Sequence, residues 1–496
     1  MRLATFLQLQ SISKRFGGVQ ALRGIDISLE QGEVHCLVGE NGSGKSTLIK
    51  IMAGVLRPDP GGRIAIQGRD YAHLDPVQST ALGIQVIYQD LSLFPNLSVA
   101  ENIAIGQHLG GVHPVNWRAV YNVANAAMAR IGVSLDPHAK VGDLSIASRQ
   151  LVAICRAMAA DARLVIMDEP TASLTRHEVD ALLALVSDLK RKGICTVFVS
   201  HRLEEVMEIA ERVTVLRDGA KVGDFEASEM DDKKLAVLMT GKAFAYQTIQ
   251  ADFSASSKVL AVAGLTRPGQ YEDITFDIYA GEIVGLTGLL GSGRTELALS
   301  LFGMNPPAAG EIRLNGKLLA LRGNLQAIQE GIAYVPEDRL TLGLVLDQPI
   351  SSNILVTILD KLAGQMGLVK ESTRAATAQL WIDDLAIKAP SRRHAVKTLS
   401  GGNQQRVVLA KWMATKPRLL ILDSPTVGVD IAAKDGIYEV VRALAASGVA
   451  VLLISDEVSE VFYHCHRVLI MRQGRMAGAF QPHGSSEAKL RDAVNA

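Results

Sequence analysis

The 496-residue sequence predicts an α/β protein built from two tandem copies of one phosphate-binding domain. Three observations support this prediction. A glycine-rich loop occurs twice, each copy lies between a short apolar run and a helix-like segment, and the same series of polar positions follows both copies. Apolar runs such as VHCLVG, RLVIMDEP and RLLILDSP have the composition of buried parallel strands. Because ligands bind beyond the carboxyl ends of such strands, we expect one ligand site per half.

The first glycine-rich loop has a complete nucleotide-binding pattern, and the second has an altered one. GENGSGKST fits G-x-x-x-x-G-K-[ST], whereas GLLGSGRTE has Arg294 in the place of Lys45. In such loops backbone N–H groups surround the phosphates, the lysine reaches the β- and γ-phosphates, and the next hydroxyl binds Mg²⁺. Arginine keeps the charge but differs in shape. The residues expected to bind nucleotide are Gly39, Glu40, Asn41, Gly42, Ser43, Gly44, Lys45, Ser46 and Thr47 in the first loop, and Gly288, Gly291, Gly293, Arg294 and Thr295 in the second.

The repeat divides the chain into a first domain at residues 1–240, a polar linker at 241–257 and a second domain at 258–496. The 51 basic and 51 acidic residues balance, which argues against a nucleic-acid binder. No apolar run approaches the roughly 18 residues that cross a bilayer, and the start of the chain does not fit a signal peptide. We therefore expect a cytosolic protein that binds no nucleic acid.

The four cysteines and a short histidine-containing segment are candidates for metal or redox chemistry. Cys36, Cys155, Cys195 and Cys465 are each surrounded by apolar residues without metal-ligand spacing, so we interpret them as packing residues. The segment YHCH at 463–466 holds two imidazoles and one thiol but no fourth ligand. We expect it to form a surface turn beside a helix rather than a metal site.

The polar positions after the two loops are similar to the motifs of the ATP-binding cassette of ABC proteins, and they occur twice in the same order. The first series contains Gln89, LSIASRQ, the Walker B strand LVIMDEP with Asp168 and Glu169, and His201. The second contains Glu337, LSGGNQQ, LLILDSP with Asp423 and Ser424, and Asp456. GRTE, VPEDR and LSGGNQQ resemble, more narrowly, the tandem ATPase subunit of bacterial monosaccharide importers of the ribose, galactose, arabinose and xylose class, which includes autoinducer-2 importers.

This resemblance implies two tandem P-loop ABC ATPase domains, each with a RecA-like α/β core, a β subdomain and a small helical subdomain. It implies that the halves face head to tail, within one chain or between chains, so that each ATP lies between one half's phosphate loop and the other half's signature. The first site would combine the first loop with Ser400, Gly401 and Gly402 of LSGGNQQ. Its other residues would be Gln89 and Asp168 at Mg²⁺ together with Ser46, Glu169 as the base for water, His201 at the γ-phosphate, and Phe16 either stacked on adenine or part of the core.

The second site departs from the pattern that the family usually shows. The family usually has LSIG in the first half and a glutamate after the second Walker B aspartate, whereas this chain has LSIA at 144–147 and Ser424. Asp456 stands where the first half has His201, and the Cβ atoms of Ile146 and Ala147 occupy space that glycines leave open for phosphate. Losing a positioned base lowers a rate by about 10² to 10⁴. We expect the second site to bind nucleotide but hardly hydrolyse it; the alternative is a half that binds no nucleotide.

The resemblance also implies a function and partners. The chain would be the ATP-hydrolysing, energy-coupling subunit of an importer for a monosaccharide or related sugar-like solute. Its partners would be integral-membrane permease subunits, expected to number two, and indirectly an external sugar-binding protein. It would sit peripherally on the cytoplasmic face of the bacterial inner membrane. The alternatives are a soluble tandem ABC ATPase that acts on ribosomes or nucleic acid, and a P-loop kinase or synthase, which has no need of a duplicated signature.

Overall fold

The computed structural model describes residues 4–107, 115–171, 174, 176–200, 202–241, 247–289, 291–364, 367–429 and 431–496. The chain forms two compact units, Met1–Phe244 and Ala245–Ala496. The division falls inside the stretch that the sequence predicts as a linker, of which residues 242–246 lie outside the described part.

A six-stranded sheet forms the core of each unit. The strands of the first unit are Val34–Val38 (β3), Ile84–Ile87 (β6), Leu164–Asp168 (β7), Cys195–Val199 (β8), Arg212–Arg217 (β9) and Ala220–Glu226 (β10). Those of the second are Ile283–Gly288 (β13), Ile332–Val335 (β16), Leu419–Asp423 (β17), Ala450–Ile454 (β18), Arg467–Arg472 (β19) and Arg475–Phe480 (β20). The strand order is β10-β9-β3-β8-β7-β6 in the first unit and its counterpart β20-β19-β13-β18-β17-β16 in the second. All pairings are parallel except those of β10 and β20 at the edges.

The central strands are buried along their whole length, as expected for parallel strands covered on both faces. The apolar runs VHCLV, CTVFV, LLILD and AVLLI form β3, β8, β17 and β18, so these predicted strands are confirmed. Each of these strands ends at the same edge of its sheet because the pairing is parallel. The motif residues that follow the strands are therefore brought together at that edge.

A second, antiparallel sheet of four strands lies beside each core. Its order is the same in both units, and β1 pairs with β2 and β4 as β11 pairs with β12 and β14. The strands are Thr5–Phe16 (β1), Val19–Glu30 (β2), Arg63–Ile66 (β4), Arg69–Tyr71 (β5), Lys258–Arg267 (β11), Tyr271–Tyr279 (β12), Ala309–Leu314 (β14) and Lys317–Leu319 (β15). This is the β subdomain that the family resemblance implies.

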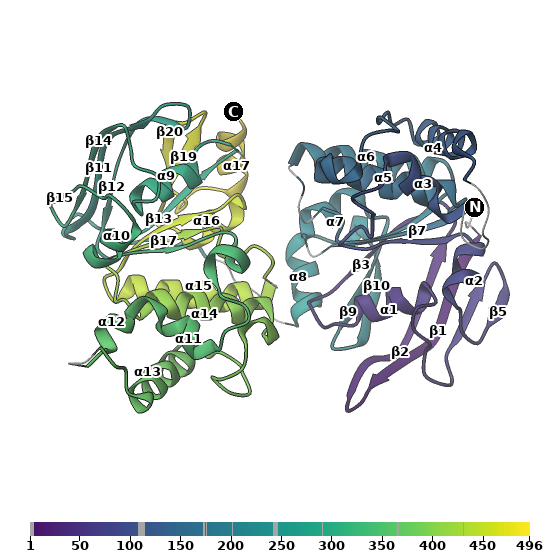
Figure 1. Cartoon of the computed structure of the whole chain (residues 1–496), viewed down its shortest axis with the longest axis horizontal. Coiled ribbons are helices and arrows are strands. Elements are labelled where there is room, and N and C mark those ends of the chain that lie inside the picture. Colours follow the sequence, from purple (N-terminus) through teal and green to yellow (C-terminus); the bar gives the residue numbers. More distant parts are fainter. Residues whose placement is uncertain are drawn as a thin grey trace. The chain divides into compact units, whose positions relative to one another are not determined.

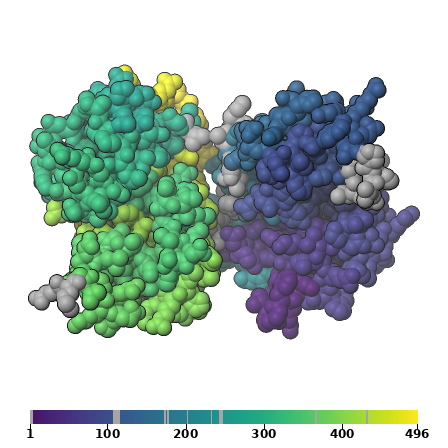
Figure 2. Space-filling view, in the orientation of Figure 1, coloured from purple at the N-terminus to yellow at the C-terminus, as the bar shows by residue number. Residues whose placement is uncertain are grey.

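Helices cover the core sheet and also form a small subdomain of their own. In Figure 1 the helices α11–α13 lie at the opposite end of the second unit from the β11–β15 sheet, and Figure 2 shows these two parts as green and teal lobes. The first unit contains Lys45–Met52 (α1), Pro76–Ala81 (α2), Val99–Ala104 (α3), Ile105–Gln107 (η1), Trp117–Ile131 (α4), Val141–Asp143 (η2), Ile146–Ala159 (α5), Arg176–Arg191 (α6), Leu203–Ile209 (α7), Ala227–Glu229 (η3) and Asp232–Thr240 (α8). The second contains Arg294–Leu301 (α9), Asn324–Glu330 (α10), the π-helical turn Arg339–Gly343 (η4), Ile350–Leu355 (α11), Val356–Ile358 (η5), Leu359–Leu362 (α12), Glu371–Asp384 (α13), Val396–Thr398 (η6), Gly401–Met413 (α14), Ile431–Ala446 (α15), Val458–His464 (α16) and Glu487–Asn495 (α17).

Local sequence explains where several of these helices begin and end. Ser98 accepts a hydrogen bond from the backbone N–H of Glu101, whose carboxylate in turn accepts from the N–H of Ser98, so α3 begins with a capping box. Gly132 ends α4 in the left-handed conformation that glycine adopts without strain. No helix within the described ranges is both long and apolar enough to cross a membrane.

The prediction of a surface turn at residues 463–466 is wrong. His464 and Cys465 are buried, and the His464 ring stacks on Tyr438 with centroids 3.8 Å apart. Burial, reinforced by the charge of Arg442, lowers the pKa of His464 to about 4. The segment lies at the end of α16, against the core of the second unit. Four residues are too short a stretch for hydrophobic periodicity to indicate this burial. The interpretation of the cysteines as packing residues is confirmed, because all four are buried and free.

Candidate functional site

The first phosphate loop connects β3 to α1 and depends on its glycines. A Cβ atom at Gly39 would lie 2.3 Å from the carbonyl oxygen of Leu216, and one at Gly44 would lie 2.7 Å from that of Ala21. Both glycines also have positive φ, 155° and 104°. Helix α1 begins at Lys45, and its N-cap residue, Gly44, has no side chain to cap it. This arrangement is suited to binding an anion.

Lys45 is buried within this loop. Its ammonium group donates to the carbonyl oxygens of Gly39 at 2.6 Å and Glu40 at 3.0 Å. The hydroxyl of Ser43 is also buried and has no hydrogen-bond partner among the described residues. A cation held by two backbone carbonyls, an unpartnered hydroxyl and an uncapped helix start together fit the phosphate groups of a nucleotide.

Two adjacent carboxylates follow the Walker B strand of the first unit. Asp168 ends β7, and Glu169 has a left-handed backbone, φ 49°, with its N–H donating to the Val199 carbonyl at 2.9 Å. Such a backbone costs about 1 kcal/mol or more, and strained positions of this kind cluster at functional sites. Burial and the charge of Glu169 raise the pKa of Asp168, and the charge of Lys45 opposes this rise. The Asp168 carboxylate and the Ser46 hydroxyl are oxygen donors of the type that Mg²⁺ prefers.

The other predicted residues of the first site lie at several places. Gln89 is exposed just after β6, and Phe16, 47% exposed, ends β1 with the Lys14 ammonium 5.7 Å from its ring centroid. The alternative that Phe16 belongs to the core is therefore wrong, and its adenine contact stays a prediction. His201 lies outside the described residues. The remaining positions are Asn41, Gly42 and Thr47 in the loop and α1, and Ser400, Gly401 and Gly402 at the start of α14 in the second unit.

The glycines of the second phosphate loop have backbone angles close to those of the first, but Arg294 follows them in place of Lys45. Gly288 and Gly293 have φ 156° and 95°, close to their counterparts. Ser424 follows β17 with φ 44°, and its N–H donates to the Ile454 carbonyl at 2.9 Å, as Glu169 does in the first unit. The loop borders a cavity of about 130 Å³ lined by Gly291, Ser292, Gly293, Arg294, Thr295, Glu296, Glu337, Asp423, Ser424, Ile454 and Asp456.

Arg294 is already engaged within this cavity. Its guanidinium forms an ion pair with Asp456 and donates to the Ser455 carbonyl at 3.1 Å, and its side chain is 7% exposed. The negative charge of Asp456 disfavours a γ-phosphate beside it. The structure shows a further effect: Asp456 holds the cation that replaces Lys45, so a phosphate group would have to compete with this carboxylate.

Tyr334 is a site residue that the motifs did not reveal. Its hydroxyl donates to the Walker B carboxylate of Asp423 at 2.9 Å, and the hydroxyl of Thr295 contacts the other oxygen at 3.4 Å. Burial raises the pKa of Asp423, against these hydrogen bonds. Sheet register places Val86 at the corresponding position of the first unit, and valine offers no such donor. A tyrosine in the otherwise aliphatic run IAYV was the available signal.

A buried glutamate in each unit was also missed. Glu205 accepts hydrogen bonds from Thr171 at 2.6 Å and Ser200 at 2.9 Å, and so joins the loop after β7 to the loop after β8. The second unit repeats these contacts with Glu460, Thr426 and Ser455. The repeat itself was the signal, because all three positions recur at the same places in both halves.

We expect Glu205→Ala to lower the melting temperature of the first unit by about 5 °C and ATP turnover by about fivefold, because two buried hydroxyls lose their acceptor. Glu205→Gln keeps one carbonyl acceptor and should have a smaller effect. Calorimetry and steady-state phosphate release measure the two quantities. Glu204→Gln, at an exposed neighbouring position on α7, is the matched control. Equal behaviour of Glu205→Ala and this control would contradict the role given to Glu205.

Comparison with known proteins assigns the chain to a family. The family described as "ABC transporter" matches residues 22–172 and 271–427, and each match contains a phosphate loop and a Walker B strand. The ribose import ATP-binding protein RbsA 2 of Rubrobacter xylanophilus is 42% identical over 97% of this chain and 93% of its own length. RbsA 2 of Streptomyces avermitilis is 43% identical over 98% and 96%, and RbsA of Geobacillus kaustophilus is 38% identical over 98% of both chains.

The fold and the two matches define an ATPase with tandem ATP-binding cassettes. The chain belongs to the ABC transporter family. The resemblance to the tandem ATP-binding subunits of monosaccharide importers is confirmed by these relatives, which the chain matches along nearly its whole length.

Proposed function

We propose that this chain is the energy-coupling ATPase of an importer for a monosaccharide or a related sugar-like solute. The observation that carries the proposal is the complete phosphate loop of the first unit, in a chain whose relatives named for ribose import align with nearly all of it. The solute class comes from those relatives. The chemistry comes from the residues of the first unit.

In the first site, Lys45 would exchange its two carbonyl acceptors for the β- and γ-phosphates. Mg²⁺, held by Ser46, Asp168 and Gln89, would neutralise phosphate charge. Glu169, next to Asp168 and fixed by its bond to Val199, would accept the proton of the attacking water. His201 would contact the γ-phosphate, and Ser400, Gly401 and Gly402 of a head-to-tail partner half would complete the site.

In the second site, we propose nucleotide binding with little hydrolysis. Ser424 has the backbone of Glu169 but no carboxylate, and Arg294 is paired with Asp456. The signature that would face this site begins with Ser145, whose hydroxyl accepts from Ser148 N–H, and with Ile146, which is 48% exposed. An apolar side chain at that position has no group that can donate a hydrogen bond to a phosphate. A second half that binds no nucleotide stays the alternative.

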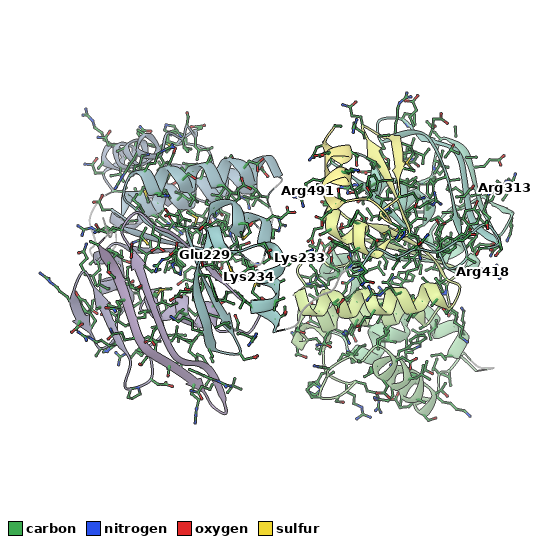
Figure 3. The ribbon with its side chains drawn as sticks, turned by 180° about the vertical axis from the view of Figure 1, so that it is seen from behind. Glu229, Lys233, Lys234, Arg313, Arg418 and Arg491 are labelled. Carbon is green, nitrogen blue, oxygen red and sulfur yellow. The ribbon has the colours of Figure 1, made fainter. Side chains whose placement is uncertain are left out.

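The proposed partners are integral-membrane permease subunits, two per complex, and indirectly an external sugar-binding protein. The chain would lie peripherally on the cytoplasmic face of the membrane. Surface charge disfavours the ribosome or nucleic-acid alternative, because the formal net charge is +0. Arg313 pairs with Glu311 at 2.9 Å within β14, and Arg491 pairs with Glu487 at 3.0 Å within α17. Figure 3 shows where the two arginines lie. These pairs leave less positive charge for a phosphate backbone.

We expect the protein to fractionate with membranes only when permease subunits are present, because its described helices include none that spans a bilayer. Cell fractionation, detergent extraction and affinity purification from its own cells measure this. Cells lacking the chain should lose uptake of a labelled monosaccharide, and a Lys45→Ala copy should not restore it. Sedimentation with ribosomes, or flotation with protein-free lipid vesicles, would contradict the proposal.

A further inference from the structure

Arg339 lies where three loops of the second unit meet. It begins η4, its Nη1 donates to the Val427 carbonyl, and its Nη2 donates to the Gly428 carbonyl at 3.2 Å. A Cβ atom at Gly401 would lie 3.0 Å from Nη2 and 2.8 Å from the Gly428 oxygen. The guanidinium therefore joins the loop after β16 and the loop after β17 to the first residue of α14.

This contact explains why a glycine begins α14. A side chain at Gly401 would collide with a backbone oxygen and with the guanidinium, so both would have to move. The start of α14 is thus packed directly on the loop that follows Walker B. In the first unit the corresponding helix position is Ile146, whose side chain is half exposed. The start of α14 is therefore packed against a neighbouring loop, whereas the first side chain of α5 is half exposed.

The backbone of Arg339 is tied to the second phosphate cavity. Its N–H donates to the Glu337 carbonyl at 3.0 Å, and Glu337 lines the cavity together with Arg294 and Asp423. Asp338, between them, accepts from the N–H groups of Leu340 and Thr341 and fixes the π-helical turn. A movement of Glu337 toward or away from a ligand is therefore transmitted over two residues to Arg339.

Glu337 responds to the charge inside the cavity. Partial burial raises its pKa, and the charges of Asp423 and Asp456 raise it further while that of Arg294 lowers it. A polyphosphate that drew Arg294 away from Asp456 would change this balance. Glu337 is thus placed to register whether the cavity is occupied.

No guanidinium occupies the corresponding position of the first unit. Sheet register shows that Ile84 of the first unit corresponds to Ile332 of the second, so Leu91 corresponds to Arg339. Leucine has no donor group, and the carbonyls of Leu91 and Ser92 instead accept hydrogen bonds from Arg156 of α5. The guanidinium link from the loop after β16 to the signature is therefore a feature of the second unit's sequence.

We infer that Arg339 is a positioning residue that connects the second phosphate cavity to the signature serving the first site. It holds the Val427 and Gly428 carbonyls against the start of α14, and so sets how Ser400 and Gly401 are presented to the ATP bound by Lys45. The inference rests on the proposed head-to-tail pairing. Through it, the site that hardly hydrolyses ATP would control the rate of the site that does.

The test compares Arg339→Met, Arg339→Lys and Arg406→Met in the full-length chain. Arg406 is the matched control: it lies on α14 itself and donates to two carbonyls, those of Leu385 and Ala386, which do not line the second phosphate cavity. We expect Arg339→Met to lower kcat about 10-fold with KM for ATP changed less than about twofold, and Arg339→Lys, which keeps one bond, to lower kcat about threefold. Arg406→Met should leave kcat within about twofold of the parent.

A double-variant cycle separates positioning from stability. We expect Glu337→Gln to change kcat in the parent but to have no further effect in the Arg339→Met background, since the signal passes through Arg339. If Arg339→Met fails to fold, the same cycle is run with Arg339→Lys. Two results would overturn the inference and leave the proposed function standing. One is additive effects of the Glu337 and Arg339 substitutions on kcat. The other is a parent-like kcat of Arg339→Met when Lys45→Ala abolishes turnover. Turnover that survives Lys45→Ala overturns both.

Discussion

Replacement of Glu169 by glutamine should lower ATP turnover of the whole chain at least about 100-fold, the effect of removing a positioned general base. The amide has the same shape and can keep the left-handed backbone that Glu169 adopts with φ 49°. Binding of ATP should therefore stay within about twofold of the parent, because the Lys45 loop is unchanged. Phosphate release and equilibrium binding of a fluorescent ATP analogue measure the two quantities.

Two further variants make this result specific. Lys45→Ala should lose nucleotide binding at the first loop, because it removes the ammonium group that donates to the Gly39 and Glu40 carbonyls. Ser424→Ala changes the residue with the same backbone bond in the second unit and should leave turnover unaltered. A Glu169→Gln protein with more than about a tenth of parental turnover would show that Glu169 is not a base worth 10² or more.

The parts of the fold that sequence predicted are those set by local pattern. Buried apolar runs identified the strands, and the repeated motifs placed Asp168 and Asp423 at strand ends. Glycine positions were informative because every other residue carries a Cβ, which at Gly39 would lie 2.3 Å from the Leu216 carbonyl oxygen. These features need only a few neighbouring residues to be recognised.

The parts that sequence did not predict depend on which strands lie side by side. Arg294 and Asp456 are 162 residues apart and meet because β13 pairs with β18. Tyr334 reaches Asp423 across the pairing of β16 with β17. Single motifs indicated that each residue was present, but not that two substitutions, Lys to Arg and His to Asp, form one ion pair.

We expect several substitutions together, not Ser424 alone, to disable the second site. In a Glu169→Gln background the first site is silent, so turnover must come from the second. The backbone at Ser424 matches that at Glu169, so Ser424→Glu should place a carboxylate without strain. We nevertheless expect the double variant to stay near background, because Arg294 remains paired with Asp456.

Measurable phosphate release should appear only when the further changes Asp456→His, Ile146→Gly and Ala147→Gly are added. The first frees the guanidinium and supplies a histidine, and the other two give the opposing signature its glycines. Adding Arg294→Lys then restores the same cation as Lys45 and should raise turnover again. The matched control carries all of these changes but keeps Ser424, and it should remain silent for lack of a base. Substantial turnover by the Glu169→Gln/Ser424→Glu protein alone would mean that Ser424 is the sole defect and that the Arg294–Asp456 pair does not hinder phosphate binding.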